Sequence, residues 1–418
     1  MKRNRIFEIS ALLSFLCIAF VAVFGFSVHN KASAETETPL PVTAMLKEQS
    51  KGNDSAAADP LGDKAKGKSA YLVDYSTGKV LYSRNENARL PIASMVKIMT
   101  LLITFEAIEE GKLALDEKII ISDTAAGMGG SQMFLQKGDE YTVSDLIKGI
   151  AVVSANDASV AIGERLAGSK DEFVRKMNAK AESLGMNDTV FVNVTGLPQD
   201  GQYSTAHDVS LMFCKLLTHP LYFNYSKTYL EEYTHPDGRK NQFANTNKLL
   251  RFYKDCDGGK TGFTNAAMFC LSATAKRDNL RVIATVIGAP DSKSRFNEVS
   301  GMFDYAFTSY QSKKIIAKGE KLDEIVTIKK SKGISELIAA DDLFVTTQKG
   351  NSGNYTTRFE LLNGIKAPVK ANETVGTLFV RDAEGNEVGQ VTIVAKHDIK
   401  KQTFGDILKE LFGKLTIG

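Results

Sequence analysis

The chain has 418 residues, of which 43% are hydrophobic and 24% are charged, and its formal net charge is +3. This length exceeds one ordinary domain, and the hydrophobic content excludes a globally disordered chain, so we expect two domains plus appendages. Residues 1–34 carry four basic residues and one acidic residue. Their net charge equals that of the whole chain, so the remainder is neutral and no nucleic-acid partner is expected.

Residues 1–34 have the features of a secretory signal peptide. Three basic residues stand within the first five positions, an apolar run covers 11–28, and Ala32-Ser33-Ala34 places small residues at a cleavage site. We expect cleavage after Ala34; the alternative is an uncleaved membrane anchor. Residues 35–66 lack apolar periodicity and are rich in Ala, Asp, Lys, Thr and Ser, which predicts a flexible linker.

Residues 67–312 are predicted to form a mixed α/β (α+β) domain in which strands at both ends enclose helices. Alternating or β-rich runs predict hairpins at 70–82 and 268–288. A helix over 94–110 is apolar on nearly every face and should be buried. Further helices are predicted at 143–153, 158–167, 172–184, 206–217 and 295–310.

The C-terminal part changes character. Residues 318–398 are predicted to form a small all-β domain, with a sandwich as the expected arrangement and strands at 325–328, 343–346, 355–361, 375–380 and 388–394. Apolar residues then recur with helical spacing over 400–418, with lysines among them. This pattern predicts an amphipathic helix that binds a membrane surface, or alternatively packs on its own β domain.

Cysteine and histidine usage points away from a disulfide framework and from metal chemistry. Cys17 lies in the signal region, which leaves an odd number of cysteines. We expect buried thiols, or one Cys256–Cys270 bridge beside a free Cys214. The histidines outside the signal region show no paired ligand spacing, which argues against a zinc carboxypeptidase; they are His207, His219, His235 and His397. No metal or other cofactor is expected.

Three short motifs follow one another along the chain: Ser94-Met95-Val96-Lys97, Ser154-Ala155-Asn156 and Lys260-Thr261-Gly262. Ser-x-x-Lys, Ser-x-Asn and Lys-Thr-Gly are the signature set of penicillin-binding proteins and serine β-lactamases. Each motif is weak alone, and Ser-x-x-Lys and Ser-x-Asn have other matches in the chain, but those lie in a predicted turn or in the wrong order.

The spacing of Ser94 and Lys97 suits nucleophilic catalysis. A serine hydroxyl is a poor nucleophile until a base takes its proton, and Lys97 lies one helical turn further on the same face. Apolar surroundings should lower the pKa of Lys97. The helix N-terminus would also place backbone N–H groups near a developing oxyanion.

The other two motifs supply polar groups for a substrate. Ser154 lies between two predicted helices, where its hydroxyl can relay a proton, although a plain helix N-cap is the alternative. Lys260 offers a cation and Thr261 a hydroxyl for an anionic substrate end, and Gly262 allows close backbone approach. The alternative for this motif is an ordinary turn.

With these motifs and the longer blocks around them, the chain resembles the low-molecular-mass penicillin-binding proteins, which are serine D-Ala-D-Ala carboxypeptidases of peptidase family S11. The blocks are Phe134–Gly138, Ser154–Ala158, Asp200–Ser204, Asp257–Gly262 and Arg295…Glu298. The resemblance is close over 69–310 and looser beyond. It implies a transpeptidase-like domain, a β-rich domain and a terminal helix that holds the enzyme at the outer face of the membrane.

The resemblance also implies roles. Ser94 would be acylated by the stem pentapeptide of peptidoglycan, or by a β-lactam, with Lys97 as base. Ser154 and Asn156 would line the cleft and assist proton transfer and amide binding.

On the carboxylate side, the resemblance implies that Lys260 and Thr261 hold the terminal carboxylate region, with Arg295 in support. The backbone N–H groups of Ser94 and Phe263 would form the oxyanion hole. Family members often have an arginine where this chain has Thr246.

The motifs leave two alternative functions. A class A β-lactamase adds a glutamate that activates the deacylating water, and the chain has no glutamate from Ser183 to Leu230. A non-catalytic protein that binds β-lactams or the cell wall is the second alternative, and the intact Ser94 and Lys97 argue against it.

Overall fold

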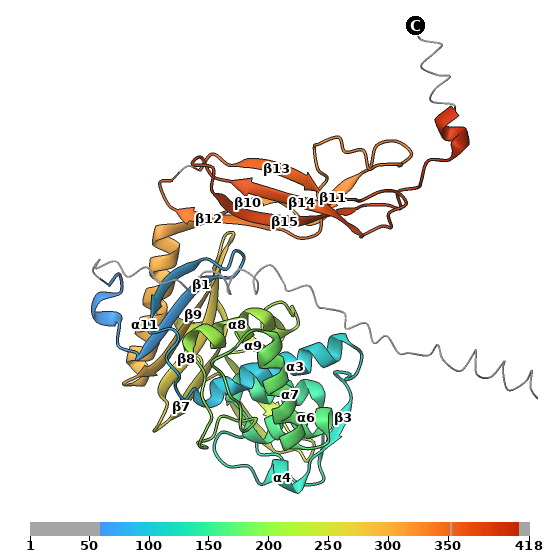
Figure 1. The fold of residues 1–418 in the computed structure, drawn as a ribbon. Coiled ribbons are helices and arrows are strands. Elements are labelled where there is room, and N and C mark those ends of the chain that lie inside the picture. The colour runs from blue at the N-terminus through green and yellow to red at the C-terminus, as the bar shows by residue number, and fades with distance from the viewer. Residues whose placement is uncertain (1–58, 352, 409–418) are drawn as a thin grey trace, which may run out of the picture. The chain divides into compact units, whose positions relative to one another are not determined.

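The computed structural model describes residues 59–351 and 353–408 (Figure 1). The expected signal peptide, most of the expected linker and residues 409–418 of the expected terminal helix lie outside these ranges. Of that helix the structure describes a short helical segment at 404–408, on which Phe404 is exposed. Among the described residues, no helix is long and apolar enough to cross a membrane.

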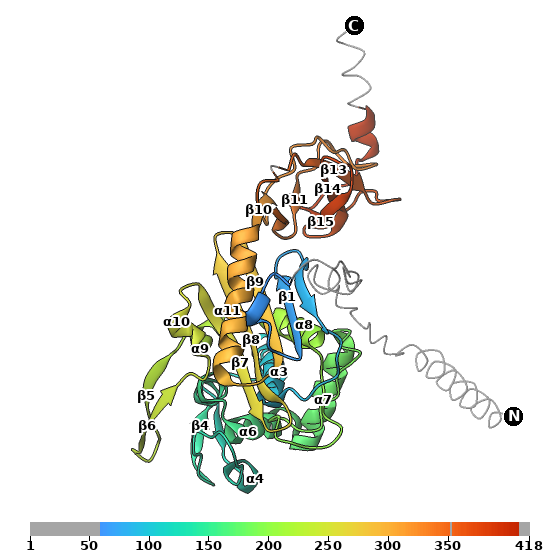
Figure 2. The same cartoon turned by 90° about the vertical axis from the view of Figure 1, so that its left-hand side faces the viewer.

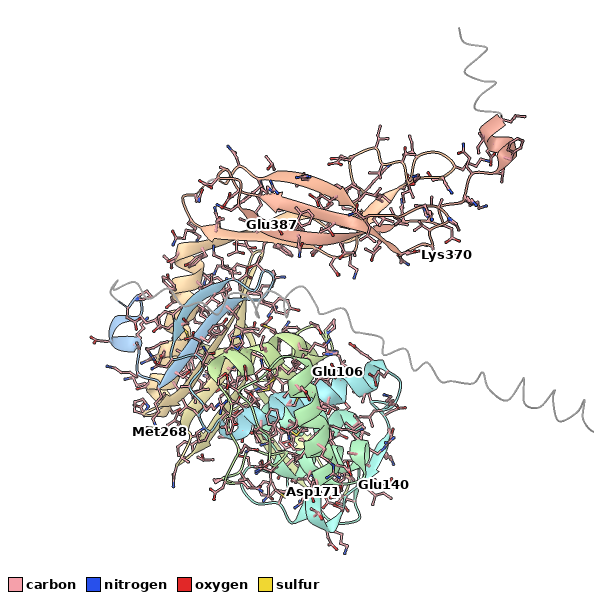
Figure 3. The ribbon with its side chains drawn as sticks, in the orientation of Figure 1. Glu106, Glu140, Asp171, Met268, Lys370 and Glu387 are labelled. Carbon is pink, nitrogen blue, oxygen red and sulfur yellow. The ribbon has the colours of Figure 1, made fainter. Side chains whose placement is uncertain are left out.

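A five-stranded antiparallel sheet organises the first domain, with the strand order β2-β1-β9-β8-β7. Met268, labelled in Figure 3, begins β8 after the β7–β8 turn. The pairing of β1 with β9 joins the two ends of the domain, and β7 has an open edge. The strands are β1 (Ser69–Asp74), β2 (Val80–Arg84), β7 (Cys256–Thr264), β8 (Met268–Arg277) and β9 (Leu280–Ala289).

Both faces of this sheet are buried, because successive side chains of a strand point to opposite sides. On β1, Tyr71 and Val73 join the core of the helical part, whereas Ala70 and Leu72 join a second core against α11 (Ser292–Ser309). Helix α8 (Ala206–Leu216) packs on the first of these faces (Figure 1).

The helical part is inserted between β2 and β7 (Figure 2). The expected helices are present with shifted ends, while several short elements were not predicted. The elements are η2 (Ala93–Val96), α3 (Lys97–Glu109), β3 (Lys118–Ile120), α4 (Asp123–Ala126), β4 (Glu140–Thr142), α5 (Val143–Lys148), the π-helical η3 (Gly149–Val153), α6 (Asn156–Ala167), α7 (Lys170–Ser183), α8, α9 (Tyr222–Ser226), β5 (Leu230–Thr234), β6 (Lys240–Ala244) and α10 (Leu249–Phe252). The expectation of a flexible linker up to residue 66 is wrong at its described end: a short helix η1 (Gly62–Lys64) precedes β1, and Leu61 before it is buried in the core against α11.

The C-terminal part is all-β, as expected, and its two sheets share one hydrophobic core. The predicted strand at 325–328 is wrong: only Val326 forms a bridge there. Strands β10 and β11 were missed, because β10 follows α11 without a break and β11 is only three residues long. The strands are β10 (Tyr310–Ile316), β11 (Leu337–Ala339), β12 (Leu343–Gln348), β13 (Thr356–Leu361), β14 (Thr374–Arg381) and β15 (Glu387–Ala395).

The three described cysteines are Cys214, Cys256 and Cys270, and all of them are buried free thiols. Burial raises the pKa of the Cys256 thiol to about 12 and that of Cys270 to about 11. The optional Cys256–Cys270 bridge is therefore absent from the structure.

Candidate active site

Ser94 stands in a tight turn before a helix. The expected helix start at Ser94 is instead the 3₁₀ turn η2, and the α-helix begins at Lys97. Ala93 has a left-handed backbone with φ of 49°, a conformation that non-glycine residues adopt mainly where the surroundings impose it. The side chain of Ser94 remains half-buried, so a substrate can reach it.

Lys97 is fully buried and faces Ser94. Its Nζ donates to Ser94 Oγ at 3.1 Å and to the carbonyl oxygen of Thr195 at 2.6 Å. Desolvation lowers the pKa of Lys97 well below its ordinary value, and the charge of Lys260 lowers it further, while Asp157 opposes them. A neutral lysine amine in contact with the serine hydroxyl can act as a general base.

The Thr195 carbonyl is held by a turn that the sequence analysis did not single out. Asn193 Oδ1 accepts from the backbone N–H of Gly196 at 2.7 Å and of Thr195 at 3.2 Å, and its Nδ2 donates to the Leu197 carbonyl at 3.0 Å. Gly196 has φ of 82°, and a Cβ there would lie 2.0 Å from the Ala93 carbonyl oxygen. An Asn two residues before Thr-Gly is a turn signal that could have identified this segment.

Ser154 occupies the junction between η3 and α6. It has a left-handed backbone with φ of 64°, and its Oγ accepts a hydrogen bond from Lys260 Nζ at 2.7 Å. The N-cap residue of α6 is Ala155, so the alternative of a plain N-cap role for Ser154 does not hold. Two motifs separated by more than one hundred residues thus meet through their side chains.

Asn156 is buried beside Ser154 at the start of α6. Its Nδ2 donates to the Gly129 carbonyl at 2.7 Å, whereas its Oδ1 has no hydrogen-bond partner among the described residues. The hydrogen bond to Gly129 fixes this amide side chain at the start of α6, beside Ser154. Asp157, which was not singled out, holds the neighbouring loop by accepting from the N–H groups of Met133 and Leu135.

Lys260, Thr261 and Gly262 lie on β7, at the edge of the sheet. Burial, followed by the charge of Arg295, lowers the pKa of Lys260 to about 7. Thr261 Oγ1 donates to Thr246 Oγ1 at 2.7 Å, so the threonine found in place of the family's arginine belongs to this site. A Cβ at Gly262 would lie 2.6 Å from the Ile92 carbonyl oxygen and 3.2 Å from Ser94 N, so β7 directly contacts the Ser94 turn.

Arg295 lies behind the strand rather than on the Thr261 hydroxyl. Its Nη1 donates to the carbonyls of Cys270 at 3.1 Å and Gly262 at 3.3 Å, and desolvation lowers its pKa to about 10. Phe263, one residue beyond Gly262, is 52% exposed and its ring lies 4.4 Å from that of Phe269. Arg295 makes no contact with the hydroxyls of Thr261 or Thr246 among the described residues. Its positive charge acts on the site by lowering the pKa of Lys260.

The chain matches two protein-family models. Residues 53–291 match the family described as D-alanyl-D-alanine carboxypeptidase, and residues 310–401 match the penicillin-binding protein 5 C-terminal domain. Over 350 residues the chain is 40% identical to the D-alanyl-D-alanine carboxypeptidase DacF of Bacillus subtilis, an alignment that covers 84% of this chain and 90% of that protein.

Solved structures agree with these matches. Penicillin binding protein 5 from Haemophilus influenzae superposes with a TM-score of 0.68 at 28% identity, covering 80% of this chain and 98% of that one. Penicillin-binding protein D2 from Listeria monocytogenes, solved in its ampicillin-bound form, superposes with a TM-score of 0.52 at 33% identity, covering 58% of this chain and 97% of that one. Both the catalytic part and the all-β part therefore have solved counterparts.

Proposed function

The chain belongs to the D-alanyl-D-alanine carboxypeptidase family of serine hydrolases, and from that premise we propose that Ser94 is its nucleophile and Lys97 its general base. The observation that carries this proposal is the 3.1 Å contact between Lys97 Nζ and Ser94 Oγ, made by a lysine whose burial favours the neutral form. The substrate is the stem pentapeptide of peptidoglycan, and the product is the peptide without its last D-alanine.

Acylation proceeds by attack of Ser94 Oγ on the carbonyl carbon between the two D-alanines, while Lys97 takes the hydroxyl proton. The backbone N–H groups of Ser94 and Phe263 stabilise the resulting oxyanion. When the C–N bond breaks, the amine of the last D-alanine needs a proton. Ser154 relays to it the proton that Lys97 took from Ser94, so Ser154 keeps a hydroxyl proton and Lys97 is neutral again. The hydrogen bond from Lys260 Nζ orients the Ser154 hydroxyl for this transfer.

Deacylation uses the same groups. Water attacks the acyl carbon while neutral Lys97 accepts a proton from it, and Lys97 returns that proton to Ser94 Oγ as the acyl C–O bond breaks. Asn156 assists in binding the substrate amide, and Lys260 with the Thr261–Thr246 hydroxyl pair holds the terminal carboxylate region. Arg295 supports that region through its charge. A β-lactam enters the same cycle as a slow substrate that acylates Ser94.

The ends of the chain complete the proposal. Residues 1–34 direct the protein out of the cytoplasm and are removed, and a linker from residue 35 leads to the catalytic domain, to whose core Leu61 already belongs. The β domain at 318–398 follows, and the helix at 400–418 attaches the enzyme to the outer face of the membrane. Exposed Phe404, Ile407 and Leu408 at 404–408 support this attachment.

The direct test is release of D-alanine from an N-acylated pentapeptide that ends in D-Ala-D-Ala. We expect multiple turnovers by the purified protein and no turnover when the last residue is L-alanine. Absence of D-alanine release would favour the non-catalytic wall-binding alternative, and rapid hydrolysis of penicillin would favour a β-lactamase.

A further inference from the structure

The end of the β domain from which the terminal helix leaves is strongly basic. Three segments meet there through backbone hydrogen bonds: 328–334, 364–370 and 399–403. Ala367 N donates to the Lys329 carbonyl at 2.9 Å, and Lys332 N donates to the Lys400 carbonyl at 3.1 Å. Together the three segments carry seven lysines and no acidic residue. Lys370, labelled in Figure 3, lies at this end of the domain, so the lysines are gathered in one place.

Most of these positive charges are not neutralised within the domain. Only two of the seven lysines have an ion-pair partner: Lys332 Nζ lies 2.7 Å from Asp406 Oδ1, and Lys370 Nζ lies 3.0 Å from Asp398 Oδ2. The other five are exposed and form no ion pair with any residue that the structure describes; they are Lys329, Lys330, Lys366, Lys400 and Lys401. These five residues form the basic patch, whose uncompensated charge attracts anions.

Two lysines of the basic patch stand directly opposite each other. Lys329 and Lys366 form a parallel β-bridge, and neighbouring strands lie only about 4.8 Å apart. Like charges that face each other in this way destabilise the pairing. The next residue, Lys330, has a left-handed backbone with φ of 64°, which adds a conformational cost. A negatively charged surface against the patch would relieve the repulsion, so this arrangement suits a bound state better than a free one.

Exposed apolar side chains adjoin the basic patch. Ile334 follows it in the same segment and is 67% exposed, and Phe404 on the terminal helix is 78% exposed. The Lys332–Asp406 ion pair joins these two parts of the chain. Lysines beside exposed apolar side chains are typical of surfaces that lie in a membrane interface, where the apolar groups enter and the lysines meet anionic headgroups. A soluble polyanion would account for the lysines alone and leave the apolar side chains in water.

We propose that the basic patch binds the anionic lipid headgroups of the membrane, as a second contact beside the terminal helix; this inference deepens the membrane attachment proposed above and rests on it. The lysine ammonium groups meet headgroup phosphates, while Ile334 and Phe404 enter the interface. One short apolar anchor binds a membrane reversibly, and a basic cluster supplies the second signal for stable attachment. Because both contacts belong to one chain, their affinities combine, and the β domain itself is held on the membrane.

The test is co-sedimentation of the purified protein with vesicles of phosphatidylcholine alone, and with vesicles that contain about one third phosphatidylglycerol. The patch variant combines Lys329→Gln, Lys330→Gln, Lys366→Gln, Lys400→Gln and Lys401→Gln. We expect its partition coefficient on the anionic vesicles to fall at least about 100-fold, and its weak binding to phosphatidylcholine to stay within about twofold. Salt at about 0.5 M should remove most of this difference, because it screens exposed charges.

Two further variants separate the patch from net charge and from the helix. The matched control makes the same change at five exposed lysines of the catalytic domain, namely Lys170, Lys248, Lys254, Lys276 and Lys293, and should bind both vesicles within about threefold of the wild type. Phe404→Ser should weaken binding to both kinds of vesicle. The patch variant should release D-alanine at the wild-type rate and melt no earlier than the wild type, since a repulsion has been removed.

Other outcomes overturn the proposal. Wild-type binding of the patch variant to anionic vesicles would show that these lysines meet no lipid, and an equal loss in the matched control would show that only net charge matters. Binding of the wild type to soluble polyglycerol phosphate but to neither vesicle would assign the patch to a polymer instead. Unchanged binding by Phe404→Ser would refute the helix attachment alone, and failure of the wild type to release D-alanine would refute the proposed enzyme activity while the vesicle result stands.

Discussion

Lys260 donates a hydrogen bond to Ser154 at 2.7 Å, and Lys97 makes the same kind of contact with Ser94 at 3.1 Å. The site therefore contains two serine–lysine pairs, one on the turn before α3 and one that joins the η3–α6 junction to β7. Both lysines are almost completely buried, and the charge of Lys260 lowers the pKa of Lys97. One lysine can thus serve as a cation for the substrate while it helps to keep the other neutral.

This coupling predicts a bell-shaped pH profile for kcat/KM. At acid pH, protonation of Lys97 removes the base and activity falls. At alkaline pH, Lys260 loses its proton above about 7 and the attraction for the substrate carboxylate weakens. A bound carboxylate raises the pKa of Lys260, so the alkaline limb of kcat should lie higher. The test is to measure kcat/KM against pH for a diacetylated tripeptide that ends in D-Ala-D-Ala and for its C-terminal amide. The amide has no carboxylate, so its profile should lack the alkaline limb. Identical alkaline limbs for the two substrates would contradict this role of Lys260.

A second prediction concerns stability. The folded pKa of Lys97 lies below its unfolded value of about 10.4, so between these two values the unfolded state binds more protons. The free energy of unfolding of the wild type should therefore rise with pH in this window, by up to about 1.4 kcal/mol per pH unit. Lys97→Met should be inactive yet gain melting temperature at pH 7, and the gain should shrink towards pH 10. Lys170→Met is the control, and a pH-independent difference for Lys97→Met would refute this explanation.

Asn193 is predicted to act as a positioning residue. Asn193→Ala removes the side chain that holds the Thr195–Gly196 turn, so the carbonyl that anchors Lys97 can move. We expect kcat to fall about 10- to 100-fold with KM changed less than about threefold, since small misplacements of a catalytic group are costly. The exposed Asn187→Ala is the control. A purely structural role would instead lower the melting temperature and leave the kcat of the folded protein intact.

Gly262→Ala is predicted to abolish most activity. The added methyl would lie 2.6 Å from the Ile92 carbonyl oxygen, so β7 must move away from the Ser94 turn and widen the oxyanion hole. We expect kcat/KM to fall at least about 100-fold. Gly405→Ala, where the nearest atom is 3.9 Å away, should be neutral. Near-normal acylation by penicillin in Gly262→Ala would show that the close approach is not required.

The residues of this site that belong to short motifs could be predicted from the sequence. Ser94 and Lys97 are three residues apart, so one helical turn dictates their contact. Sequence reasoning could not identify the contacts that the fold makes between distant segments, namely that of Lys97 with the Thr195 carbonyl and that of Thr261 with the Thr246 hydroxyl. These contacts depend on how the loop before α8 and the segment before α10 pack against α3 and β7, and no local pattern specifies that packing.

For the fold, too, the elements with a strong sequence pattern were predictable and the others were not. The long buried helix and the β8–β9 hairpin have strong periodic patterns and were predicted. The short β5–β6 hairpin and β11 lack such a signal, and β10 continues directly from α11. The position of Arg295 could not be predicted from the sequence either, because it depends on how α11 packs against β7 and β8.

Intact mass spectrometry of the purified protein after exposure to penicillin G, alongside Ser94→Ala, tests the central claim most directly. We predict one covalent penicillin on the wild type that persists for minutes or longer, and none on Ser94→Ala. An adduct that survives in Ser94→Ala, or the absence of an adduct on either protein, would contradict the assignment of Ser94 as the nucleophile.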